Sequence, residues 1–301
     1  ITIIDLDANT GQPLAISWRQ DITLGFEEGV DPIAPAPGAI ADTPVLIPME
    51  SADGSQAALY VLLVNDAGHV TNLKLIDLGN LGFREDVDLV AAPYPDLMGV
   101  ACLESEDHSV RGVLGVDLNP IDVAPPGNAF GSCVLLSSDA RPGCEGPAIL
   151  ADWLPGLVDG VDPIAYPTDT SVRLALPVKS WTGGGDLLML DFDNSFEPPI
   201  WTMMRSVKAT NSAGLRPTSF PGFEYDVDMV MIPTAQCGLA ADRILVPVEG
   251  PGDVADLYML DREGNSVWTL SHDSGFPTLV FPGFEAGVDL VPMCGLPGGA
   301  A

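Results

Sequence analysis

The sequence contains the stretch Gly25-Phe26-Glu27-Glu28-Gly29-Val30-Asp31-Pro32-Ile33, whose pattern is Gly-Φ-x-x-x-Val-Asp-x-Φ, where Φ is an apolar residue. This pattern, which we call the phrase, occurs five times, with first residues Gly25, Gly82, Gly156, Gly222 and Gly283. These glycines lie 57, 74, 66 and 61 residues apart. A repeat of this length built from strands is typical of a propeller or a solenoid. We therefore expect a single domain over residues 1–301.

Each phrase is followed by a similar series of short apolar segments. After the fourth phrase the predicted strands are Asp228–Ile232, Arg243–Val248, Asp256–Asp261 and Ser266–Ser271. The second strands predicted in the other repeats are Thr43–Glu50, Gly99–Glu104 and Val172–Val178. Four strands joined by tight turns and followed by a long connection are typical of a propeller blade. The fold class is therefore all-β, with an insertion predicted at about residues 120–150, where the longest repeat lacks a clear fourth strand.

The two ends of the chain together predict a fifth blade. Residues 1–7 and 12–18 match the third and fourth strands of a blade, and residues 288–293 of the fifth phrase match a first strand. We therefore predict a five-bladed β-propeller whose closing blade is shared by the N- and C-terminal segments. The pattern has no second strand for that blade. Either another segment of the same chain or a strand donated by a neighbouring subunit would fill its place.

Two segments resemble known repeats. The stretch Ile4-Asp5-Leu6-Asp7-Ala8-Asn9-Thr10-Gly11, followed by Trp18, resembles the blade hairpin of PQQ-like propellers. The phrase ending in Val-Asp-Leu-Val is similar to FG-GAP/VCBS repeats, in which an aspartate-rich calcium loop precedes the strand, although the alternating aspartates are absent here. Both resemblances imply blade geometry. They imply no particular activity, because propellers host enzymes, lectins and scaffolds.

The charge of the chain restricts its partners. There are 42 Asp and Glu against 12 Lys and Arg, for a formal net charge of −30. Such a surface repels phosphate backbones, so we expect no nucleic acid and no anionic membrane as a partner. No apolar run approaches the ~18 residues of a transmembrane segment. Because Ile1 opens strand-like sequence, we expect a processed mature chain located outside the cell, at its surface or in the periplasm.

The phrase aspartates are the candidate metal ligands, namely Asp31, Asp88, Asp162, Asp228 and Asp289. If the first strand of each blade is innermost, these side chains form a ring near one mouth of the central channel. Crowded carboxylates favour a hard cation such as Ca²⁺, which takes oxygen ligands. The alternative is that each aspartate caps a turn by accepting backbone N–H bonds. No other cofactor and no catalytic residue is predicted.

Two of the five cysteines are candidates for a disulfide. Cys133 and Cys144 flank the turn-rich segment Asp139-Ala140-Arg141-Pro142-Gly143, which would bring them together. The alternative is that both are small apolar residues that remain unpaired. The chain has no Cys-x-x-Cys motif for a metal or redox site.

These observations favour a binding module over an enzyme. We expect a secreted or cell-surface propeller that contacts a protein or a glycan, as one subunit of a larger extracellular assembly. The alternative is a five-bladed glycoside hydrolase or lyase that uses carboxylates at the channel mouth, for which two carboxyl groups at a suitable separation are required.

Overall fold

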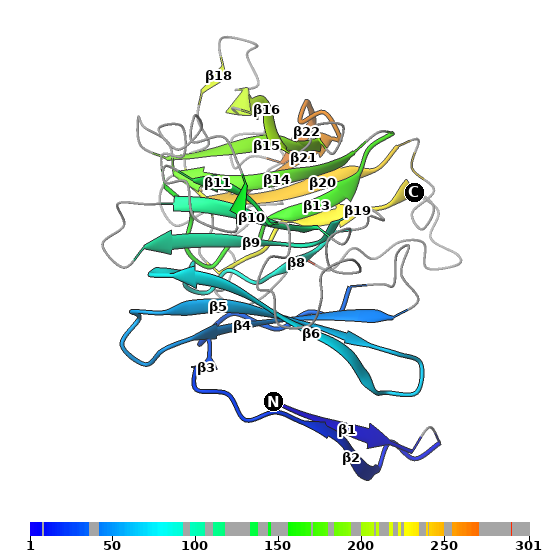
Figure 1. The fold of residues 1–301 in the computed structure, drawn as a ribbon. Coiled ribbons are helices and arrows are strands. Elements are labelled where there is room, and N and C mark those ends of the chain that lie inside the picture. The colour runs from blue at the N-terminus through cyan, green and yellow to red at the C-terminus, as the bar shows by residue number, and fades with distance from the viewer. Residues whose placement is uncertain are drawn as a thin grey trace. The chain divides into compact units, whose positions relative to one another are not determined.

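The structure is a computed structural model in which the described residues form strands joined by turns (Figure 1). The described residues are 1–7, 9–35, 42–92, 97–105, 111–117, 133–137, 144–145, 156–169, 171–179, 184–193, 200–207, 209–210, 217–218, 222–223, 226–234, 239, 241–249, 255–270 and 290. They contain six sheets, and the strand pairs whose register is described are antiparallel except for one. The expected all-β class is confirmed. No helix in this part of the chain has the length and apolarity needed to cross a membrane.

The chain divides into two compact units. Unit 1 comprises Ile1–Asp152, Tyr166–Val172 and Asp193–Trp201, and unit 2 comprises Trp153–Ala165, Arg173–Phe192 and Thr202–Ala301. Each is described by itself below.

Unit 1 contains a hairpin and two larger sheets. The hairpin consists of β1 (Thr2–Leu6) and β2 (Pro13–Arg19). The next sheet has the order β3 (Gly25–Phe26), β4 (Thr43–Glu50), β5 (Ala57–Val64) and β6 (Val70–Gly79). The third sheet contains β7 (Leu81–Phe83), β8 (Val90–Ala91), β9 (Leu97–Ser105), β10 (Arg111–Asp117), β11 (Cys133–Ser137) and β12 (Cys144–Glu145). Its order is β12-β11-β10-β9-β7, and β8 also pairs with β9.

The remaining strands form three sheets. One has the order β13 (Ile164–Pro167), β14 (Val172–Lys179), β15 (Gly185–Asp193) and β16 (Ile200–Val207). A small hairpin joins β17 (Ala209–Thr210) to β18 (Pro217–Thr218). The last has the order β19 (Val230–Ile232), β20 (Arg243–Glu249), β21 (Ala255–Asp261) and β22 (Ser266–Leu270).

The phrase forms an interrupted first strand. In the first copy, Gly25 pairs with Glu50 at the end of β4, and Ile33 forms a bridge with Leu46 farther back on the same strand. The second copy pairs with β9 through β7 and again through β8. We expected the first strand to begin at the phrase aspartate, and the structure corrects this. Both ends of the phrase pair with the following strand, and a turn separates them.

The fifth position of the phrase explains this interruption. Gly29, Asp86, Gly160 and Asp226 occupy it, with φ angles of 72°, 53°, 61° and 57°. Glycine adopts positive φ at no steric cost, and aspartate tolerates it better than most residues. The valine that follows is buried in all four copies. The phrase therefore encodes a left-handed turn anchored by a buried side chain.

The turns after β5 and β21 have the same length, and the turn of the N-terminal hairpin is similar but one residue longer. Asp7, Asn65 and Asp261 each accept two backbone N–H bonds from the following turn residues through Oδ1. In each turn the N–H of a glycine also donates to the carbonyl of that Asp or Asn, over 2.8–2.9 Å. The turn of the β1–β2 hairpin therefore resembles those of the β5–β6 and β21–β22 hairpins. Nearly all of the rest of the predicted closing blade, residues 283–293, lies outside the described residues.

The second repeat has a fourth strand that the sequence did not reveal. β11 pairs with β10 as β6 pairs with β5, and it lies within the expected insertion at residues 120–150. The Pro-Pro-Gly sequence at 125–127 obscured this strand, because it interrupts the place where the repeat spacing predicted it. Apolar side chains of this sheet and of the β3–β6 sheet share one core in unit 1, including Leu46, Leu59, Leu81 and Leu103.

Candidate functional site

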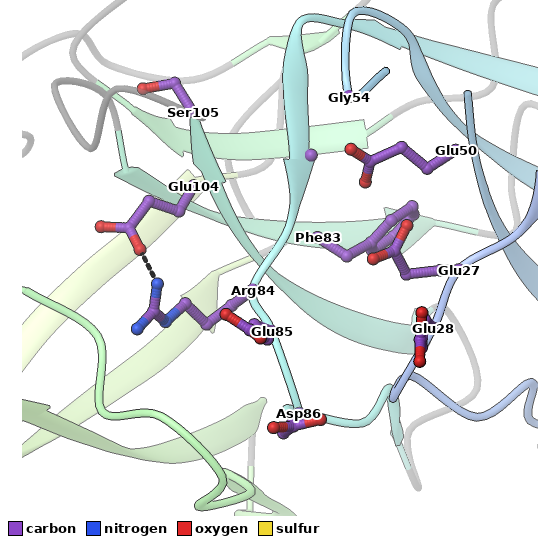
Figure 2. Close-up of a pocket in the computed structure, with 11 residues that line it drawn as sticks. Glu27, Glu28, Glu50, Gly54, Phe83, Arg84, Glu85, Asp86, Glu104 and Ser105 are labelled. Atoms are coloured by element: carbon purple, nitrogen blue, oxygen red, sulfur yellow. Dashed lines mark hydrogen bonds and ion pairs between the residues drawn. The ribbon is translucent and has the colours of Figure 1, made fainter. Parts of the chain in front are cut away.

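Unit 1 contains an acidic pocket built from two successive copies of the phrase (Figure 2). Its volume is about 630 Å³. Glu27 and Glu28 come from the first copy, and the second copy contributes the run Phe83 to Asp86. Two more carboxylates, Glu50 and Glu104, come from the ends of the second strands β4 and β9. Because each phrase pairs with the end of a second strand, the repeat itself brings these carboxylates together.

Glu27 and Glu50 form a carboxyl pair within the pocket. Figure 2 shows both side chains beside Phe83. Glu50 contributes to a raised pKa of Glu27, so the two carboxyl groups interact within the pocket. Gly82 allows Glu50 to lie close to the backbone, because a Cβ at this position would be 2.9 Å from Glu50 Oε2. The phrase glycine of the second copy therefore makes room for the second-strand glutamate of the preceding repeat.

Glu27 is held in an environment that favours its neutral carboxyl group. Burial, followed by the interaction with the Glu50 carboxyl group and the charges of Glu50, Glu28 and Glu85, raises the pKa of Glu27 to about 8. The ordinary value is 4.5, so the folded state binds a proton that the unfolded state releases between these two values. The free energy of unfolding should therefore fall as pH rises from about 4.5 to about 8. At neutral pH the pocket holds a proton that a bound cation can displace.

Among the described residues that line the pocket, Arg84 is the one cation, and it binds a carboxylate of the same pocket. Arg84 Nη1 donates to Glu104 Oε2, and Arg111 Nε donates to Glu104 Oε1 over 2.7 Å. Both Arg84 and Glu104 are buried. Their charges offset each other, so the four glutamates and Asp86 that also line the pocket keep it anionic. The site therefore suits a positively charged group.

The four phrase aspartates that the structure describes are not among the residues that line this pocket, and two of them link successive copies of the phrase. Asp88 Oδ1 accepts the backbone N–H of Asp31 over 2.6 Å, and Asp228 Oδ1 accepts that of Asp162 over 2.7 Å. The alternative to a cation ring was that each aspartate caps its own turn by accepting backbone N–H bonds. The backbone N–H that donates here belongs instead to the aspartate of the preceding copy. Asp289 lies outside the described residues. Among the residues that the structure describes, no cluster of three or more His, Cys, Asp or Glu side chains is arranged to hold a metal ion.

The link between copies gives a prediction for Asp88. Asp88→Ala removes the acceptor for the Asp31 N–H and should lower the free energy of unfolding by about 1–2 kcal/mol. Asp88→Asn keeps an acceptor oxygen and should lose less, as measured by urea denaturation. If Ca²⁺ also binds at the predicted ring, adding it should raise the melting temperature of the wild type. An alanine variant as stable as the wild type would contradict the linking role.

The acidic pocket was missed in the sequence because its residues occupy the variable positions of the phrase. Position three is acidic in the first, fourth and fifth copies, and three second strands have a glutamate as their last or next-to-last residue, namely Glu50, Glu104 and Glu249. Both features are visible in the sequence. The sequence does not show that these carboxylates meet in space, because their meeting depends on the phrase glycine pairing with the last residues of the following strand.

Comparisons with known proteins do not assign the chain to a family. No protein-family model matches it, and neither does any curated protein. Among solved structures, a Synechocystis ACO mutant is similar at 9% identity and a TM-score of 0.43, covering 89% of this chain and 55% of that one. A mutant of Synechocystis apocarotenoid oxygenase is similar at 9% identity and a TM-score of 0.36, covering 89% and 67%. The chain thus spans about half the length of the first structure. Similarity at this level establishes neither a common fold nor a common chemistry.

Proposed function

We propose that this chain is a secreted or cell-surface binding module that takes a cationic group of a protein partner in the acidic pocket of unit 1. The pocket carries this proposal, because carboxylates surround a cavity of about 630 Å³ whose one arginine is bonded to one of them. The net charge of −30 adds a long-range attraction for basic partners. A lysine or arginine side chain is the cation that such a partner would present.

The fold we propose for the module is the five-bladed propeller, closed by the N-terminal hairpin together with the fifth phrase. Two observations support it: the four phrase-led sheets follow one strand order, and the N-terminal hairpin has a turn similar to those of two other sheets. On this proposal, Ca²⁺ at the aspartate ring and strand donation from a neighbouring subunit stay as additional hypotheses.

Titration with a tetralysine peptide at low ionic strength tests the binding proposal. Glu50→Gln should weaken binding at least fivefold, about 1 kcal/mol, because it removes a carboxylate from the pocket. Asp66→Asn is the matched control, since it removes one exposed carboxylate from the turn after β5 and should leave the affinity unchanged. Equal affinities for the two variants would show that only the general surface charge attracts the peptide, and the proposal would fail.

A second candidate function is hydrolysis by the Glu27–Glu50 pair. A carboxyl group with a raised pKa, such as that of Glu27, can act as a general acid beside a second carboxyl group in the same pocket. For a glycosidase, however, the carboxyl groups lie ~5–5.5 Å apart in retaining enzymes and ~6.5–9.5 Å apart in inverting ones. A glycosidase function therefore requires one of these separations between the carboxyl groups of Glu27 and Glu50. Hydrolysis of polysaccharides or chromogenic glycosides that Glu27→Gln abolishes would support this candidate over the binding module.

A further inference from the structure

The edge of the third sheet brings two cysteines to the same level. β12 pairs with β11 in parallel, and the register places Cys144 opposite Cys133 and Glu145 opposite Val134. Across the next strands, Cys133 is level with Val116 of β10, and Val116 is level with Gly99 of β9. The described part of β12 is only two residues long, so two residue pairs join it to the sheet.

This register satisfies the backbone requirement for a disulfide. Neighbouring strands lie ~4.8 Å apart, and disulfide-linked residues have Cα atoms ~4.4–6.8 Å apart. Residues at the same level on adjacent strands also lie on the same face of a pleated sheet.

Cys102 is in the same sheet but does not meet these requirements. It is level with Val113 of β10 and Leu136 of β11, which is three residues from Cys133 along its strand. Its strand is two positions away from β11 in the sheet. That separation is about 10 Å across and about 10 Å along the strands, and an odd offset places the two cysteines on opposite faces. The register therefore selects Cys144 over Cys102 as the partner of Cys133.

We propose that Cys133 and Cys144 form a disulfide that holds β12 on the sheet and closes the loop over residues 134–143. The two thiols lose two protons and two electrons as the S–S bond forms. A small-molecule disulfide such as oxidised glutathione accepts the electrons by exchange and leaves as two thiols. A structural disulfide persists in oxidising compartments, so this bond is consistent with maturation outside the cytosol. The inference is independent of the acidic pocket, and it stands or fails separately from the proposed function.

Peptide mapping of the whole protein, folded with reduced and oxidised glutathione and alkylated without reduction, tests the bond. Cleavage before aspartate places the five cysteines in five different peptides, residues 96–106, 122–138, 139–151, 228–241 and 289–301. We expect 122–138 and 139–151 as one linked species that separates into two on reduction. Cys237→Ser should leave this species unchanged.

Two results would overturn the proposal. One is recovery of 122–138 and 139–151 as separate alkylated peptides from protein folded under oxidising conditions. The other is a link from either peptide to one of the remaining three. Because the readout is made on the wild-type protein, it does not depend on a cysteine variant that fails to fold.

Discussion

Arg173→Ala is expected to lower the free energy of unfolding by about 3 kcal/mol, because it breaks a buried ion pair in unit 2. Arg173 Nε and Nη2 donate to the two carboxylate oxygens of Asp191 over 2.6 and 3.0 Å. Nη1 donates to the carbonyl of Arg262 over 3.1 Å and lies 2.8 Å from Glu263 Oε2. The Arg173 side chain is only 8% exposed and that of Asp191 15% exposed, so water cannot replace these bonds.

Arg19→Ala is the matched control for this loss. Arg19 pairs with Asp21 on the surface, where the two side chains are 68% and 89% exposed, so the change should stay within about 0.5 kcal/mol. The double variant Arg173→Ala/Asp191→Ala should recover part of the loss, because it removes the carboxylate that the single change leaves uncompensated. Urea denaturation measures all three variants. A loss below about 1 kcal/mol in Arg173→Ala would show that the pair is not buried as described.

Deletion of residues 1–20 should destabilise unit 1 by roughly 3 kcal/mol or more, estimated from the apolar area exposed. Ile1 and Trp18 pack against a cluster formed by Ile47, Met49 and Leu62 on the neighbouring sheet. Ile1 and Thr2 also line a cavity of about 440 Å³ together with residues of that sheet, among them Val45. The deletion would expose this face to water. If the truncated chain had the same melting temperature as the full chain, this result would contradict both the packing of the hairpin on the sheet and the shared closing blade.

Ile4→Ala distinguishes the shared blade from simple packing of the hairpin. Ile4 lies three residues before the turn residue Asp7, and Leu62 and Tyr258 lie three residues before the corresponding residues of the β5–β6 and β21–β22 turns. Leu62 is 1% exposed and Tyr258 is 7% exposed. Ile4 itself is 49% exposed in the described residues. If the fifth phrase helps complete this blade, Ile4→Ala should cost about 2 kcal/mol or more, as at a core position. Val267→Ala, at an equally exposed position of β22, is the control and should be nearly neutral.

The sequence was a better guide to the regular strands than to the phrase. β4 was predicted with its bounds, and β20 and β21 to within one residue at an end, because turn residues mark both ends of these strands. The first strands were misplaced, because a left-handed residue at position five divides each of them. That requirement appears in the sequence only as a choice between Gly and Asp, which has no strand-like periodicity.

The candidate site was less predictable than the fold for a related reason. Residues that face solvent in an isolated repeat, such as Glu27 and Glu85, become pocket residues only when the next copy of the phrase lies beside them. The aspartates drew attention because they recur in every copy, yet Asp88 and Asp228 serve the connection between copies. The residues that recur in every copy thus hold the repeat together, whereas the pocket is lined by residues at the variable positions of the phrase.

The most direct test of the binding proposal is the number of protons released when tetralysine binds. Because the pKa of Glu27 is about 8, the pocket holds a proton at pH 7 that a bound cation should displace. Calorimetric titration at pH 7 in two buffers with different ionisation enthalpies gives this number. We predict release of roughly half a proton to one proton per site for the wild type and none for Glu27→Gln. Heats that do not depend on the buffer, or equal release by both proteins, would contradict cation binding at the carboxyl pair.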